Sequence, residues 1–144
     1  MQDSDAGQVR NCQLIPNWTT ATVGGLVVLG VGAERDNAAR PGPAIVLPPP
    51  GSVPRADLLL SHAAGWHHHV SSGSQTYDVY DQEISRAIRE SGAPVALSGH
   101  HHRWLLGRAN NGRTRCYGLG DRSDGWAVLD TCTLRVIRPS SALM

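Results

Sequence analysis

Two short apolar runs separated by an amphipathic stretch constrain the fold of this chain more than any other feature. The runs are residues 56–61 (ADLLLS) and 94–98 (PVALS), and each has the length and composition of a strand buried in a parallel sheet. Residues 77–91 between them repeat apolar side chains at helical spacing, and Gly92 can end a helix at that point. The sequence therefore predicts a strand–helix–strand unit over residues 57–98, with its two strands parallel.

A histidine follows each of the two predicted strands. His62 comes directly after the first run, and His100 comes after the second run and Gly99. Parallel strands joined by one crossover end at the same edge of a sheet, which is the edge where ligands of open α/β sheets bind. We therefore expect His62 and His100 to be neighbours in space although they are distant in sequence.

The remaining segments predict further strands, arranged as hairpins. Apolar or β-branched runs flank turn residues in three places, within residues 18–31, 104–119 and 126–137. Residues 41–54 hold six of the nine prolines, which disfavour both helix and sheet and predict a stiff, partly extended connection. Because neither side of this connection looks self-sufficient, we expect a single α/β domain over residues 1–144.

Charge and composition exclude several classes of protein. The net charge is +1 over 144 residues, so no global field would draw the chain to nucleic acid or to an anionic membrane. The acidic, polar start MQDSDAG is unlike a signal peptide, and the longest apolar run is too short to span a bilayer. We therefore expect a cytoplasmic protein.

The three cysteines are widely spaced and form no CxxC pair, which predicts free thiols and no cysteine zinc site.

The triplet of His100, His101 and His102 is the strongest candidate for a functional site. In extended backbone, residues two apart point the same way, so His100 and His102 can face one site while His101 faces elsewhere. A neutral imidazole nitrogen suits borderline divalent metals such as zinc, manganese, iron or nickel. With His62 at the matching strand end, the sequence predicts a metal site made by three histidines. The alternative is a solvated polar loop whose histidines have no such role.

A second histidine run lies in the loop after the first strand. His67, His68 and His69 sit in a Gly/Ser-rich stretch without a geometric partner, so we expect them on an exposed rim. Trp66 and His67 can still line the mouth of the site. Arg103, which follows the histidine triplet, can contact a phosphate group or remain a surface arginine.

These residues carry a resemblance to a known family. The order of SHAA (residues 61–64), a helix and PVALSGHHH (residues 94–102) resembles the last two motif blocks of the calcineurin-like metallophosphoesterases. In that family an H-x-P-like block follows one strand and a G-H-x-H block follows the next. Residues 26–32, 125–130 and 134–136 resemble other strands of the family, so the resemblance covers most of the chain.

The resemblance implies part of a metallophosphoesterase fold, an αββα-type β-sandwich with a flanking helix, and hydrolysis of phosphomonoesters or phosphodiesters. In the family two divalent metal ions share a bridging ligand, and a bridging hydroxide attacks the phosphate. Carried over to this chain, His62 and His100 would ligate the second metal and His102 the first. No catalytic side chain is assigned. For a phosphate-ester substrate, the candidate binding residues are His67, His101 and Arg103.

The three earlier ligand blocks of the family, D-x-H, G-D-x-x-D and G-N-H-E/D, are absent from the sequence. Three neutral imidazoles cannot offset two divalent charges, so we expect weak or no hydrolysis by this chain alone. The expected partners are then a complementing N-terminal half or a second copy bound through an exposed sheet edge. Two alternatives stay open: a non-catalytic module that binds a metal or a partner, and a truncated remnant of a phosphoesterase gene.

Overall fold

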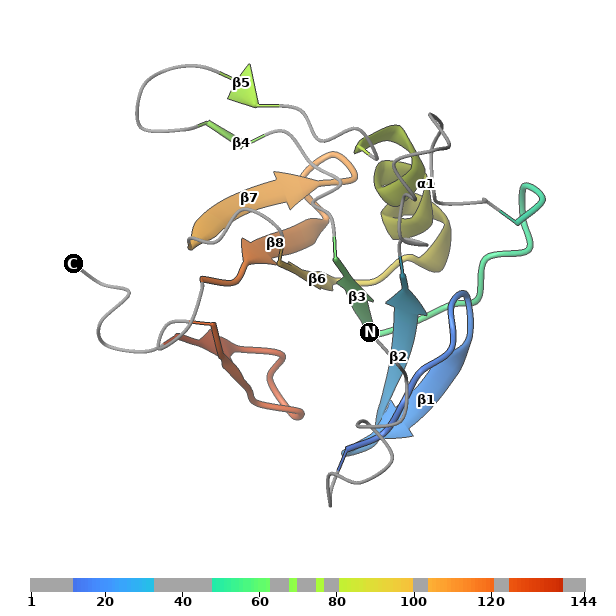
Figure 1. Cartoon of the computed structure of the whole chain (residues 1–144), viewed down its shortest axis with the longest axis horizontal. Coiled ribbons are helices and arrows are strands. Elements are labelled where there is room, and N and C mark those ends of the chain that lie inside the picture. Colours follow the sequence, from blue (N-terminus) through green and yellow to red (C-terminus); the bar gives the residue numbers. More distant parts are fainter. Residues whose placement is uncertain are drawn as a thin grey trace, which may run out of the picture.

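A six-stranded mixed sheet forms the centre of the molecule (Figure 1). The computed structural model describes residues 12–32, 48–62, 68–69, 75–76, 81–99, 104–120 and 125–138. The strands of the sheet are β1 Thr20–Val23, β2 Leu26–Val31, β3 Leu58–Ser61, β6 Val95–Ser98, β7 Leu105–Ala109 and β8 Thr114–Gly118. Their order is β1-β2-β3-β6-β8-β7, and β2, β3, β6 and β8 are parallel. The α/β class expected from the sequence is therefore confirmed.

The predicted strand–helix–strand unit is confirmed by β3, helix α1 and β6. Helix α1 spans Asp81–Ser91, and its apolar face, which includes Ile84 and Ile88, is fully buried against the sheet. Gly92 ends the helix with a φ of 66°, and its N–H donates to the carbonyl of Ile88 at 3.2 Å. Residues 77–80, where the sequence predicts the first helical turn, lie outside the described residues. No helix in the described part of the chain is long and apolar enough to cross a membrane.

The two ends of the sheet are hairpins, as the turn residues predict. Gly24 and Gly25 join β1 to β2 with φ angles of 57° and 82°, which glycine adopts without steric cost. Residues 110–113 join β7 to β8, and the first three of them (Asn-Asn-Gly) have positive φ. Strand β8 lies between β6 and β7, so the chain skips one strand position and the hairpin then fills it. This order leaves β7 at the edge of the sheet.

The third predicted hairpin is a separate two-stranded antiparallel sheet of β9 (Val128–Leu129) and β10 (Val136–Ile137). Its turn is held by Asp130, whose carboxylate accepts the N–H groups of Cys132 at 2.8 Å and of Thr133 at 3.1 Å. The N–H of Thr133, followed by that of Cys132, lowers the pKa of Asp130 below its usual value. The turn is therefore stabilised by an ionised side chain.

The loop expected after β3 contains one more short hairpin. Strands β4 (His68–His69) and β5 (Gln75–Thr76) pair antiparallel. Because each strand has only two residues, neither carries the alternating pattern from which a strand is predicted.

The sheet is covered on both faces. Alternate residues of a strand point to opposite faces, and they divide between two buried clusters. Leu59 packs with the apolar face of α1, whereas its neighbour Leu58 packs on the side that carries Leu129 and Val136 of the β9–β10 hairpin. Burying a leucine side chain fully contributes about 1.5–3 kcal/mol. The layers are therefore helix, six-stranded sheet and hairpin.

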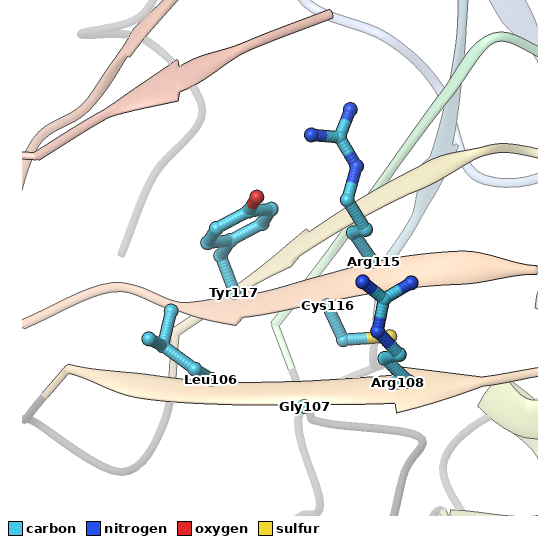
Figure 2. Close-up of a pocket in the computed structure, with 6 residues that line it drawn as sticks. All are labelled: Leu106, Gly107, Arg108, Arg115, Cys116 and Tyr117. Atoms are coloured by element: carbon cyan, nitrogen blue, oxygen red, sulfur yellow. The ribbon is translucent and has the colours of Figure 1, made fainter. Parts of the chain in front are cut away.

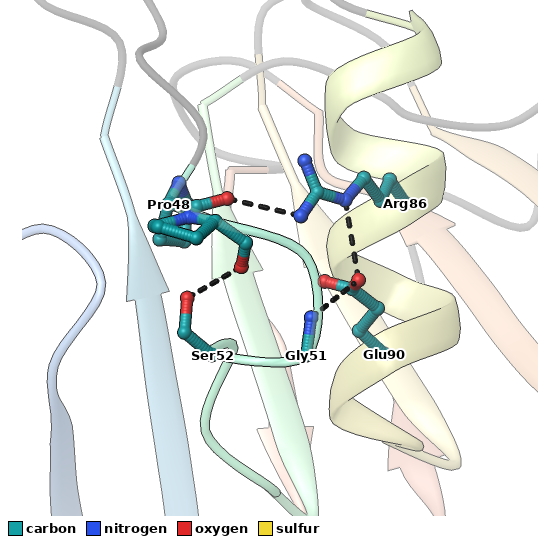
Figure 3. Close-up of polar contacts among 6 residues, drawn as sticks. Pro48, Gly51, Ser52, Arg86 and Glu90 are labelled. Atoms are coloured by element: carbon teal, nitrogen blue, oxygen red, sulfur yellow. Dashed lines mark hydrogen bonds and ion pairs between the residues drawn. The ribbon is translucent and has the colours of Figure 1, made fainter.

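A polar contact fixes the proline-rich connection to helix α1 (Figure 3). Arg86 donates to the carbonyl of Pro48 at 2.9 Å and pairs with the carboxylate of Glu90 at 3.2 Å. The same oxygen of Glu90 accepts the N–H of Gly51 at 3.1 Å. The Gly51 N–H, and after it Arg86, lower the pKa of Glu90 below its usual value. Val53, two residues further along, is buried in the core, so this part of the connection is packed against the domain.

The segment before β1 packs closely against β2 because Gly30 has no side chain. A Cβ atom at Gly30 would lie 2.9 Å from Cγ2 of Ile15 and 3.1 Å from the Ile15 carbonyl oxygen. Two hydrogen bonds hold the backbones together: Trp18 N–H donates to the Gly30 carbonyl at 2.9 Å, and Gly30 N–H donates to the Thr19 carbonyl at 3.2 Å. At Gly32, by contrast, the nearest neighbour of such a Cβ would be 4.0 Å away.

We predict that Gly30→Ala lowers the free energy of unfolding by about 1–3 kcal/mol, because the added methyl group overpacks a buried backbone contact. Gly32→Ala is the matched control, with an expected change within about 0.5 kcal/mol. Urea unfolding followed by tryptophan fluorescence measures both values. Equal losses for the two variants would contradict the close approach of Ile15 to Gly30.

Candidate functional site

The carboxyl ends of β3 and β6 meet at one edge of the sheet, as the two apolar runs predict. Ser61 is in register with Ser98, and the N–H of Gly99 then donates to the carbonyl of His62 at 3.1 Å. Strand β2 ends beside them, with Val31 in register with Ser61. His62 is exposed and lies at the edge where ligands of such sheets bind.

Only one of the site residues predicted from the sequence has a described position. His62 lies at the predicted strand end. His100 follows Gly99 in the sequence, and the backbone N–H of Gly99 is hydrogen-bonded to the carbonyl of His62. The other candidates lie outside the described residues, namely His67, His100, His101, His102 and Arg103. Within the described ranges, no group of three or more His, Cys, Asp or Glu side chains could hold a metal ion. The three-histidine site therefore stays a prediction.

A pocket of about 320 Å³ opens at this edge beside His62. It is lined by the segment before β1 and by the ends of β2 and β3, with Gln13, Ile15, Gly30, Val31, Gly32, Leu60, Ser61 and His62. The segment before β1 is also held to Gly32 of this lining, because the side-chain oxygen of Asn17 accepts the N–H of Gly32 at 2.9 Å. An apolar lining with a few polar groups is the usual composition of a small-molecule site.

A buried hydroxyl at the same edge has no hydrogen-bond partner in the described part of the structure. Ser98 is only 2% exposed, and its Oγ atom has no hydrogen bond to any residue that the structure describes. Leaving a buried polar group unsatisfied costs about 1–3 kcal/mol. Ser98 is the last residue of β6, so this hydroxyl belongs to the strand end that adjoins Gly99.

A second pocket, of about 350 Å³, lies on the β7–β8 hairpin (Figure 2). Its lining residues are Leu106, Gly107, Arg108, Arg115, Cys116 and Tyr117. Sequence reasoning missed this pocket, although a signal exists. Counting outwards from a four-residue turn at 110–113 places Arg108 opposite Arg115, but the length of that turn must be known first.

The three cysteines are free, as expected from their spacing. Cys12 and Cys132 are exposed, whereas Cys116 is 1% exposed in the core between the sheet and α1. Burial raises the pKa of the Cys116 thiol to about 12, because the thiolate loses its hydration. The thiol beneath the second pocket is therefore protonated and unreactive at neutral pH.

No family model, curated protein or solved structure matches this chain. The resemblance to the metallophosphoesterases therefore rests on the sequence motifs themselves.

We predict that iodoacetamide at about pH 8 labels Cys12 and Cys132 in the native protein and spares Cys116. A pKa of about 12 keeps the Cys116 thiol protonated there, and the thiolate is the reactive form. Peptide mass spectrometry after labelling, with and without urea, measures the reactivity of each site. Labelling of native Cys116 as fast as Cys132 would show that the β8 core is open to solvent.

Proposed function

We propose that this chain supplies the histidine half of a metallophosphoesterase-type metal site, and acts as a metal-dependent phosphoesterase only when carboxylate ligands complete that site. One observation carries the proposal: the N–H of Gly99 donates to the carbonyl of His62 at 3.1 Å. The chain therefore continues into His100 from the point where His62 leaves the sheet. The sequence motif then assigns His62, His100 and His102 as the metal ligands.

The chemistry at this edge fits a divalent ion. His62 offers an imidazole nitrogen beside a pocket of about 320 Å³, and the Oγ of Ser98 is buried without a partner among the described residues. Imidazole donors suit manganese, iron, zinc or nickel. A bound ion would polarise a phosphoryl oxygen of the ester and lower the pKa of a water molecule. The proposed contacts of the phosphate ester are His67, His101 and Arg103.

Charge limits what the chain can do alone. Two divalent ions a few ångströms apart repel strongly, and anionic ligands usually offset that repulsion. Neutral imidazoles do not, and the described residues contain no cluster of carboxylates at this edge. We therefore propose one metal ion per isolated chain. A complementing N-terminal half would bring the aspartates that a second ion needs.

The layers of the domain support the finer fold assignment within the same proposal. A helix covers one face of the six-stranded sheet and the β9–β10 hairpin covers the other. In an αββα-type sandwich a second sheet occupies the position of that hairpin. We propose that β9 and β10 form part of such a second layer.

A non-catalytic metal-binding module is the second candidate. The observation that favours it is again the lack of a carboxylate cluster within the described ranges. Three histidines are enough to hold one zinc ion, with water in the fourth position. This candidate and the phosphoesterase share the metal site and differ in whether a completed site hydrolyses esters.

We expect tag-free, metal-stripped protein to bind close to one zinc ion, and to show little turnover of bis-p-nitrophenyl phosphate with added manganese. His62→Ala should weaken zinc binding at least tenfold. Loss of a group that only hydrogen-bonds to a metal ligand already costs 10–100-fold in affinity, and His62 is proposed as a direct ligand. His69→Ala is the matched control, since His69 is outside the proposed ligand set. Isothermal titration and elemental analysis measure the metal, and p-nitrophenol release measures turnover.

The outcomes separate the parts of the proposal. Absence of bound metal, or equal effects of His62→Ala and His69→Ala, would contradict the site. Robust turnover that His100→Ala abolishes would contradict the need for added carboxylates. Metal binding without turnover, even after addition of a polypeptide that carries the missing blocks, would favour the non-catalytic module.

A further inference from the structure

The pocket on the β7–β8 hairpin is built by four side chains on one face. Leu106 is in register with Tyr117, and Arg108 is in register with Arg115. Residues directly opposite each other in an antiparallel pair project from the same side of the sheet. Figure 2 shows these four side chains rising together from the hairpin, around a pocket of about 350 Å³.

Two guanidinium groups share this pocket, and neither has an acidic partner among the residues that the structure describes. Like charges directly opposite each other across two strands are destabilising. In the described part of the chain the one side-chain ion pair joins Arg86 to Glu90, so neither Arg108 nor Arg115 is neutralised by a carboxylate there. An anion held between them would remove the repulsion.

Both guanidinium groups are already held in place by backbone carbonyls. Arg108 donates to the carbonyl of Gly112 at 3.1 Å, and Arg115 donates to the carbonyl of Leu134 at 2.7 Å. A guanidinium carries five N–H donors, so each side chain keeps donors for a ligand. Because these side chains are positioned beforehand, a ligand loses less conformational entropy when it binds.

We propose that this pocket binds a phosphate monoester that carries a planar organic group. The two positive charges match the charge of a phosphate dianion, and the guanidinium fork matches its oxygen geometry. Next to the arginines, Tyr117 offers a ring and Leu106, which is 57% exposed, offers an apolar surface. The volume falls in the range of small-molecule sites, so the ligand is of about nucleotide size.

The arginine pair of this pocket lies away from the histidine edge. Arg115 is in register with Val95, the first residue of β6, whereas Gly99 follows the last. A strand rises about 3.3 Å per residue, so four residues separate the Arg115 end of the pocket from Gly99 by about 13 Å. The other end of the pocket lies nearer, because Tyr117 is in register with Leu97. Binding in this pocket needs no metal ion and is independent of the proposed function.

Calorimetric titration of the full chain with phenyl phosphate in EDTA tests the proposal. We expect one molecule of phenyl phosphate per chain, weaker binding of inorganic phosphate, and the weakest binding of benzoate, which has one negative charge. Arg108→Gln should weaken phenyl phosphate binding about tenfold or more, because it removes a charge-assisted hydrogen bond. Arg113→Gln is the control, since Arg113 is an exposed residue of the same hairpin and does not line the pocket.

A second variant separates the contribution of the ring from that of the charges. Tyr117→Leu should remove most of the preference for phenyl phosphate over inorganic phosphate and keep the binding of inorganic phosphate. Circular dichroism of each variant confirms that it folds. Undetectable binding of phenyl phosphate, or equal losses for Arg108→Gln and Arg113→Gln, would overturn the proposal. Arg108-dependent binding of single-stranded oligonucleotide that is tighter than binding of phenyl phosphate would also overturn it, in favour of a nucleic-acid surface.

Discussion

The parallel pairing of β3 with β6 is the constraint on which the rest of the structure depends. It places Leu58 opposite Val95 and Ser61 opposite Ser98. This register decides which side chains enter each of the two buried clusters, and it also makes the two strands end side by side. Slipping this register by one residue would move each buried side chain to the opposite face. The hydrogen bond from the N–H of Gly99 to the carbonyl of His62 at 3.1 Å continues the pairing past the last residue of each strand. Core packing and the geometry of the sheet edge are therefore set by the same contacts.

The contacts around this pair bring other segments to it. Helix α1 covers one face and is tied through Arg86 and Glu90 to the proline-rich connection. The segment before β1 reaches the sheet edge at Gly30, where a side chain would collide with Ile15. That approach forms one wall of the pocket beside His62. The segment before β1 can therefore line the candidate site only because residue 30 is a glycine and has no Cβ atom.

The sequence predicts local elements well because their signals are local. Apolar runs such as LLLS and VALS, the Gly24-Gly25 pair and the Asn-Asn-Gly turn each specify a strand or a hairpin. The position of β8 between β6 and β7 depends on pairing between distant residues, which no local pattern encodes. The pair of Arg108 and Arg115 was missed for the same reason, because it exists only in one register of the hairpin. At the histidine edge, strand geometry predicts the position of His62, whereas the roles of His100 and His102 stay predictions.

A double-mutant cycle on zinc affinity tests the central claim most directly, namely that the ends of β3 and β6 hold one metal ion between them. Zinc affinity would be measured for the tag-free chain, for His62→Ala, for His100→Ala and for the double variant. If both side chains ligate one ion, each single change weakens binding, and the double variant departs from the sum of the two losses by about 0.5–3 kcal/mol. Losses that add within about 0.3–0.5 kcal/mol, or a His100→Ala variant with unchanged affinity, would contradict the claim.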